Sequence, residues 1–185
     1  VTNSPFIVLG IIGFFKIQKQ DLTGVLPKLF RAYLTFFLGL VLTGLASGYY
    51  HLDPSNSTLV GDRMAITITF MSFFVLIFGE SISPKTASRL LVPLLFLGLS
   101  SVVYWNITEK LGTGDLRFYA LVQYLPMLLI PFMLLFYGSH LSGRIWILAI
   151  ILVYGAAKIS EIYDHQIYEL IGFSGHSLKH LIASF

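Results

Sequence analysis

The feature that most constrains this chain is a series of seven apolar runs, separated by short loops that hold Gly, Pro and charged residues. The runs cover residues 5–15, 32–50, 64–79, 90–105, 118–137, 145–160 and 167–185. A helix needs about 20 apolar residues, within a range of about 17–25, to cross a bilayer. Only 11% of the residues are charged, whereas soluble domains average about 25%. The runs therefore predict membrane spans, the first of them short.

Inside a bilayer the backbone must satisfy its own hydrogen bonds, which leaves helices or closed barrels. The runs lack the alternation of barrel strands. We therefore predict an all-α, polytopic integral membrane protein, with residues 1–185 forming a single bundle of seven transmembrane helices. The chain has no cysteine, which excludes disulfides and thiolate metal sites. Its net charge of +3 is scattered between the runs, so no nucleic acid partner is expected.

The charges of the loops predict the orientation. Basic residues gather in alternate loops: Lys16, Lys19, Lys28, Arg31, Lys85, Arg89 and Arg144. The other loops are acidic, with Asp53, Asp62, Glu109, Asp115, Glu161, Asp164 and Glu169 against Arg63, Lys110 and Arg117. Lys and Arg mark the cytoplasmic side of a membrane protein. The N-terminus is therefore expected outside and the C-terminus in the cytoplasm.

Polar residues in membrane spans are costly and usually functional. Ser47 and His51 lie at i and i+4 near the end of the second run, and Asp62 opens the third. His176 and His180 repeat the i, i+4 spacing in the last run. Two histidines so spaced share one helix face and suit a common metal ion. A third histidine from another helix completes the ligand set of a catalytic zinc, whose fourth position binds water.

Structural readings compete with this one. A single histidine in a span is more often a packing residue, and the 176/180 pair alone leaves metal binding at even odds. Ser47 alone reads as a helix-packing hydroxyl, and Asp62 alone as the N-cap of the third span. His140 and His165 are expected to be solvated. Lys158, Glu161 and Asp164 are expected to form an interfacial charge cluster.

The depth of the site depends on where the last span begins. A start near Ile167 would place His176 about 14 Å inside the membrane, at about 1.5 Å per residue. A later start near Gly172 would place it at the membrane surface, level with His51. Gly172 and Gly175 allow either a late start or close helix packing.

Taken together, Ser47-x-x-x-His51, Asp62 and His176-x-x-x-His180 resemble the signature of the alkaline ceramidase family. This family belongs to the CREST superfamily of seven-span membrane hydrolases, which includes the adiponectin- and progestin-receptor type proteins. Val1-Thr2-Asn3-Ser4-Pro5-Phe6 is also similar to the family's entry into its first span. The resemblance thus covers nearly the whole chain, and its short loops are similar to those of a bacterial member.

The resemblance implies a zinc ion held by His51, His176 and His180. It implies that Asp62 orients or deprotonates the zinc water, and that Ser47 steadies the oxyanion. The implied reaction is hydrolysis of ceramide, or of a similar N-acyl lipid drawn from the bilayer, to a fatty acid and an amine. The expected location is a bacterial inner membrane, with the site toward the periplasm. Eukaryotic members bind calcium through an acidic segment before the first span; this chain, starting at Val1, leaves calcium undetermined.

Two other functions stay open at this stage. The chain could be a receptor-like or transport protein in which the His/Asp cluster binds a metal structurally or relays protons. A haem protein is a weaker alternative, because an i, i+4 pair on one helix cannot supply both axial ligands. The acyl-chain preference, the choice between amide and ester, and the oligomeric state are not specified by the sequence.

Overall fold

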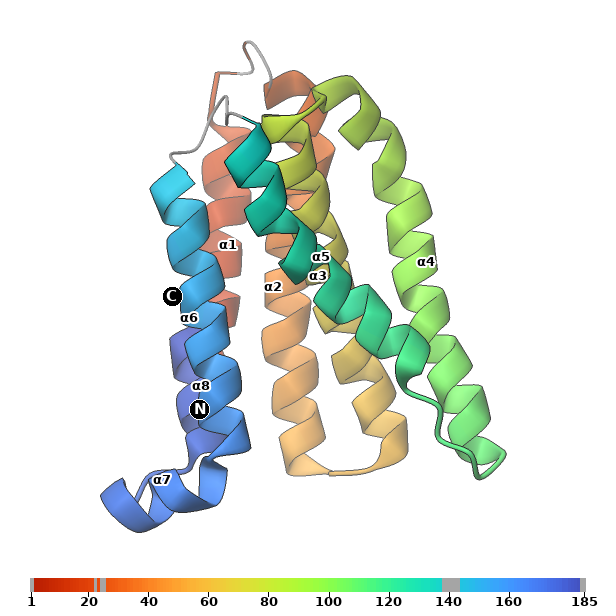
Figure 1. Cartoon of the computed structure of the whole chain (residues 1–185), viewed down its shortest axis with the longest axis vertical. Helices are drawn as coiled ribbons and strands as arrows, with labels where there is room; N and C mark the ends of the chain where they lie inside the picture. Colours follow the sequence, from red (N-terminus) through yellow and green to blue (C-terminus); the bar gives the residue numbers. More distant parts are fainter. Residues whose placement is uncertain (1, 22, 24–25, 138–143, 184–185) are drawn as a thin grey trace.

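The computed structural model of the chain describes residues 2–21, 23, 26–137 and 144–183, and all the regular secondary structure within them is helical (Figure 1). Eight helices follow one another in these described residues: α1 (Ser4–Gln18), α2 (Leu26–Leu52), α3 (Asn56–Ser81), α4 (Pro84–Lys110), α5 (Arg117–Phe136), α6 (Arg144–Ile162), α7 (Asp164–Ile171) and α8 (Gly175–Ala183). The prediction of an all-α fold is confirmed. The prediction that residues 1–185 form one domain stays a prediction.

In the part of the chain that the structure describes, five helices, α2 to α6, are long and apolar enough to cross a membrane. They contain the second to sixth predicted runs, apart from a difference of one residue at the end of α5. Most of the helices extend beyond the apolar runs because their ends carry the polar residues of the interfaces. The chain is therefore compatible with a membrane-embedded helical bundle. Helix α1 is also apolar but has only 15 residues.

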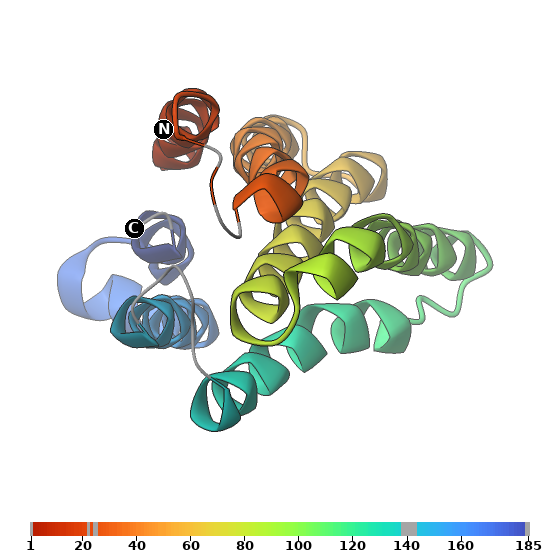
Figure 2. The same cartoon turned by 90° about the horizontal axis from the view of Figure 1, so that it is seen from above.

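The long helices run alternately up and down, so alternate connections gather at the same end of the bundle (Figure 1). The α2–α3 loop, the α4–α5 loop and α7 lie at the lower end in that view. Seen from above, α6, α7 and α8 group together beside α2 and α3, while α1 lies next to α2 (Figure 2). The lower end is thus the one that carries His51 and the start of α8.

The last predicted span, 167–185, is wrong as a single helix. The chain forms α7, turns at Gly172 and begins again as α8 at Gly175. Gly172 has a φ of 67°, a left-handed conformation that favours glycine and ends a helix. The later of the two starting points considered from the sequence is therefore the one observed, and it places His176 in the first turn of α8.

The prediction that Asp62 caps the third span is also wrong. Helix α3 begins six residues earlier, at Asn56, and its N-cap is Ser55, whose hydroxyl accepts a hydrogen bond from the Thr58 amide. The Thr58 hydroxyl in turn accepts a hydrogen bond from the Ser55 amide, which completes a capping box. Asp62 therefore lies inside the helix and is available for another role.

Candidate metal centre

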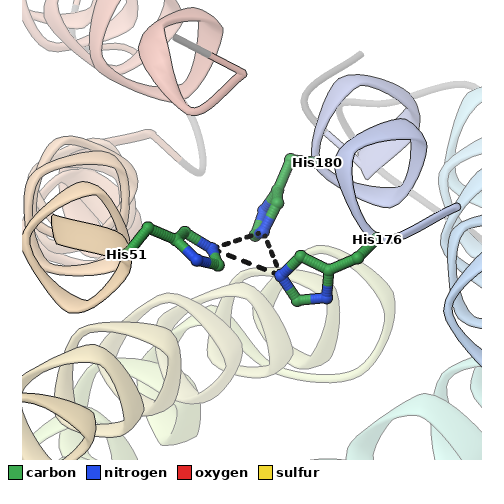
Figure 3. A group of neighbouring side chains, drawn as sticks. All are labelled: His51, His176 and His180. Carbon is green, nitrogen blue, oxygen red and sulfur yellow. Dashed lines mark hydrogen bonds between the residues drawn. The ribbon is translucent and has the colours of Figure 1, made fainter. Parts of the chain in front are cut away.

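Three histidine side chains from two distant parts of the chain meet at the lower end of the bundle (Figure 3). The Nε2 atoms of His51 and His176 are 3.2 Å apart, and those of His176 and His180 are 3.1 Å apart. The third pair, His51 and His180, is separated by 3.3 Å. His51 is exposed, His176 is half-buried and His180 is buried. The cluster is thus closed on the α8 side and open on the α2 side.

The contact of three Nε2 atoms is unfavourable by itself. A neutral imidazole nitrogen either donates a proton or accepts one. In a triangle of three such atoms at least two have the same role, so at least one pair is donor against donor or acceptor against acceptor. A cation at the centre removes the conflict, because all three nitrogens then offer lone pairs to it. The arrangement therefore favours a bound metal ion.

The spacing also fits a particular geometry. With Zn–N distances of about 2.0–2.1 Å, tetrahedral coordination separates the ligand nitrogens by about 3.3–3.4 Å. The observed separations of 3.1–3.3 Å come close to this value. Nitrogen atoms this close together cannot lie on opposite faces of a haem, which argues against the haem alternative. The His51, His176 and His180 group could hold a metal ion, and its donor set suits zinc.

The local structure explains how α8 delivers its two histidines. The Asp164 carboxylate accepts hydrogen bonds from the His176 amide at 2.9 Å and from the Ser174 hydroxyl at 2.8 Å. These bonds hold the start of α8. A Cβ on Gly175 would collide with the carbonyl oxygen of Ser160 and the Cα of Asp164. Glycine therefore lets α8 pack directly against the end of α6.

Ser47 is buried, and its hydroxyl accepts a hydrogen bond of 3.2 Å from Asn3 Nδ2. It lies one turn before His51 on α2. Asp62 lies at about the same depth on α3, because α2 and α3 are antiparallel and joined by a short loop. Within the described part of the chain, Asp62 Oδ1 is buried without a hydrogen-bond partner. Such an atom costs free energy unless a ligand or water satisfies it.

A cavity of about 220 Å³ runs along the bundle beside this cluster. Its walls are mostly apolar, and Ser47, Lys179 and His180 are among the lining residues. His51, Asp62 and His176 each lie one turn beyond a lining residue, namely Ser47, Ile66 and His180. They therefore extend the cavity-facing stripes toward the lower end of the bundle. On α2 the lining runs from Phe36 to Ser47, or roughly 16 Å.

One set of residues beside the cluster was not predicted as part of the site. Glu161 on α6 forms ion pairs of 2.8 Å with both Lys158 and Lys179. The predicted charge cluster around Lys158 and Glu161 therefore exists, but Lys179 takes the place given to Asp164. The periodicity of α8 was a usable signal, since Lys179 lies at i+3 from His176. His165 is exposed, as predicted, whereas His140 lies outside the described residues.

Comparison with known proteins gives no match: no family model, no curated protein and no solved structure is significantly similar to the chain. The functional reading therefore depends on the residues and geometry of the site itself.

Proposed function

We propose that the chain is a zinc-dependent intramembrane hydrolase that cleaves the amide bond of ceramide or a similar N-acyl lipid. One observation carries the proposal: three Nε2 atoms at a spacing close to tetrahedral lie at one end of an apolar cavity inside a helical bundle, and one of the three histidines, His180, lines that cavity. The resemblance of the five-residue pattern to the alkaline ceramidases supports the same reaction. A structural metal site would not need a cavity beside it.

The cavity suits one acyl chain. The bilayer core is about 30 Å thick, so the lining of roughly 16 Å on α2 matches the chains of one leaflet. Its volume of about 220 Å³ is below the range of about 300–1,000 Å³ of pockets for drug-sized ligands. An acyl chain lying along these walls would bring its carbonyl carbon to the polar end, beside Ser47 and His180.

Each polar residue of the site has a separate role in the proposed hydrolysis. His51, His176 and His180 would hold zinc, which when bound supplies a Lewis acid and lowers the pKa of water to about 7. Asp62 accepts the proton of the attacking water and delivers it to the leaving amine. Ser47 accepts from Asn3, so its own O–H can donate to the carbonyl oxygen as negative charge develops there. The products are a fatty acid and an amine.

The same proposal includes the membrane arrangement. We take α1 and the α7–α8 segment to complete the seven spans, with the N-terminus outside and the C-terminus in the cytoplasm. The basic loops then face the cytoplasm, and the histidine cluster opens toward the periplasm of a bacterial inner membrane. In this setting the partners are the bilayer and its N-acyl lipids.

The test is a lipid hydrolysis screen with the purified full chain in detergent, run with and without a zinc chelator. It should include ceramide, other N-acyl lipids and matched esters. We expect release of fatty acid that the chelator abolishes and that zinc restores. Asp62→Asn should abolish release, while Asp53→Asn, which changes an exposed carboxylate in the adjacent loop, should not.

Two results would reject the proposal, the first of them in favour of a receptor-like or transport protein. One is ion flux or a ligand response in the absence of any turnover. The other is hydrolysis that persists after zinc is removed.

A further inference from the structure

The ring nitrogen of His176 that faces away from the cluster lies among charged groups. Its Nδ1 atom is 3.8 Å from Glu161 Oε1 and 3.5 Å from Lys179 Nζ. Lys179 Nζ is in turn 2.8 Å from the same Glu161 oxygen. Lys158 Nζ holds the other oxygen, Oε2, at 2.8 Å. Helix α6 therefore presents a carboxylate to His176 that is fixed from both sides by lysines.

Metal binding at Nε2 determines what Nδ1 must do. A neutral imidazole has one N–H, and when Nε2 offers its lone pair to a cation that N–H is at Nδ1. Nδ1 must then donate a hydrogen bond. Glu161 can accept it, whereas the ammonium group of Lys179 has only donors and cannot. The contact between Lys179 and Nδ1 therefore belongs to the metal-free tautomer, and the contact with Glu161 to the metal-bound one.

From this geometry we propose that Glu161 is a positioning residue, which holds His176 in its metal-binding tautomer and orientation, and that Lys179 acts against it. Carboxylates that accept from a metal-ligating histidine fix the tautomer and orientation of the ring and raise its basicity as a ligand. Lys179 competes for Nδ1 and places a positive charge near the dication. Lys158 anchors the carboxylate and keeps it in place when Lys179 turns away. The proposal uses the metal site of the proposed function but does not depend on hydrolysis.

The two residues should therefore change metal affinity in opposite directions. Loss of an outer-shell partner typically weakens metal binding by about 10–100-fold. Glu161→Gln, which removes the carboxylate, should weaken Zn²⁺ binding by at least about 10-fold, and Glu161→Asp, which keeps a carboxylate, should recover part of the loss. Lys179→Met should tighten binding by about 10-fold, at the lower end of outer-shell effects. Glu169→Gln is the matched control, since Glu169 pairs with the exposed His165 at the same end of the molecule.

The experiment is competition of the detergent-solubilised full chain with a chromogenic chelator for Zn²⁺, without any substrate. A Co²⁺ absorption spectrum of each variant reports ligand geometry, which a purely structural role of Glu161 would not change. Melting of the metal-free variants measures folding separately. Wild-type affinity in Glu161→Gln, or weaker binding in Lys179→Met, would overturn the proposal. If Glu161→Gln fails to fold, Glu161→Asp and Lys179→Met can still be compared. The proposal requires weaker Zn²⁺ binding in the first variant and tighter Zn²⁺ binding in the second.

The outcomes also separate this proposal from the proposed function. A chain that binds Zn²⁺ with the expected pattern but hydrolyses no lipid would leave the role of Glu161 standing and reject the hydrolase. A chain that hydrolyses lipid, but whose zinc affinity does not change in Glu161→Gln, would leave the hydrolase standing and reject the role of Glu161.

Discussion

Two carboxylates lie inside the bundle near opposite ends of helix α3, and their surroundings differ. Glu80 is almost fully buried, and its Oε1 atom accepts a hydrogen bond from the Tyr33 hydroxyl. Tyr33 packs against a core cluster that contains Leu29 and Val75. Asp62 instead has a buried oxygen without a partner, on a helix face that continues the cavity wall. The Glu80 end of α3 is therefore closely packed, whereas the Asp62 end has space for a ligand.

The difference shows how a buried polar residue can be assigned a role. Ionisable residues within membrane spans are functional candidates by default. A carboxylate whose hydrogen bonding is met by a packed neighbour can serve the fold alone. One whose oxygen is unmet beside a cavity and a histidine cluster keeps its bonding capacity for a substrate or water. Changes at the two ends should therefore separate activity from stability.

The largest effect is expected from Asp62→Asn. General acid–base catalysis contributes about 10²–10⁴-fold, so lipid hydrolysis should fall by at least about 100-fold. The melting temperature should stay close to that of the wild type, because the amide replaces a carboxylate that has an unmet oxygen. Lipid turnover measures the activity of the variant, and thermal unfolding of the same preparation measures its stability. An active Asp62→Asn variant would show that hydrolysis does not require this carboxylate, and would contradict the contrast between the Glu80 and Asp62 ends of α3.

Tyr33→Phe should reduce stability and leave activity unchanged. Removing the hydroxyl takes away a hydrogen bond of buried Glu80, which should cost about 1–3 kcal/mol of stability. Zinc affinity and the hydrolysis rate of the folded fraction should not change, because the pair lies near the other end of α3. Chemical or thermal unfolding gives the stability, and zinc competition gives the affinity. A loss of zinc binding without a loss of stability would contradict the assignment.

Gly175→Ala tests how the Asp62 end is assembled. The new Cβ would press on the Ser160 carbonyl and on Asp164 and push α8 away from α6. Overpacking typically costs about 1–3 kcal/mol. If about 1.4 kcal/mol of that falls on the metal site, zinc affinity drops about 10-fold. Gly48→Ala is the matched control, since a Cβ there meets nothing within 4 Å. Equal zinc affinities in the two variants would show that the position of α8 does not limit the site.

The smallest effect is expected at the α4–α5 loop, none of whose residues lines the cavity. The Asp115 carboxylate accepts hydrogen bonds from the side chain and the amide of Arg117, and these lower its pKa well below the ordinary value. Its contribution to stability is therefore present above the unfolded pKa, near 4, and is lost as the pH falls through the lower folded value. Asp115→Asn should slightly reduce stability at pH 7 and hardly at all in strong acid. Melting curves across pH measure this.

Much of the fold follows from hydropathy. The second to sixth spans appear as helices because continuous apolar runs in a bilayer must satisfy their backbones internally. The break between α7 and α8 does not follow from hydropathy, since it depends on the left-handed Gly172 and on capping of α8 by Asp164. The start of α3 was misplaced for a similar reason: the polar segment that begins at Asn56 is helical because Ser55 caps it.

The site was predictable in part. The i, i+4 spacing of His176 and His180 alone left metal binding open, and the resemblance to the alkaline ceramidases added His51; the structure brings these three residues together. The packing of α6 against α8, which places Glu161 beside His176, could not be seen from a single helix pattern. Nor could the hydrogen bond from Asn3 to Ser47, which joins residues 44 positions apart. Contacts of this kind require the three-dimensional arrangement.

The most direct test of the central claim is X-ray absorption at the zinc edge of the purified full chain in detergent. A four-coordinate zinc with three imidazole nitrogens at about 2.0–2.1 Å and one light atom is the expected result. The signal of the three imidazoles should be lost in His180→Ala. Zinc absent from the wild type, or surrounded by oxygen atoms only, would contradict the account.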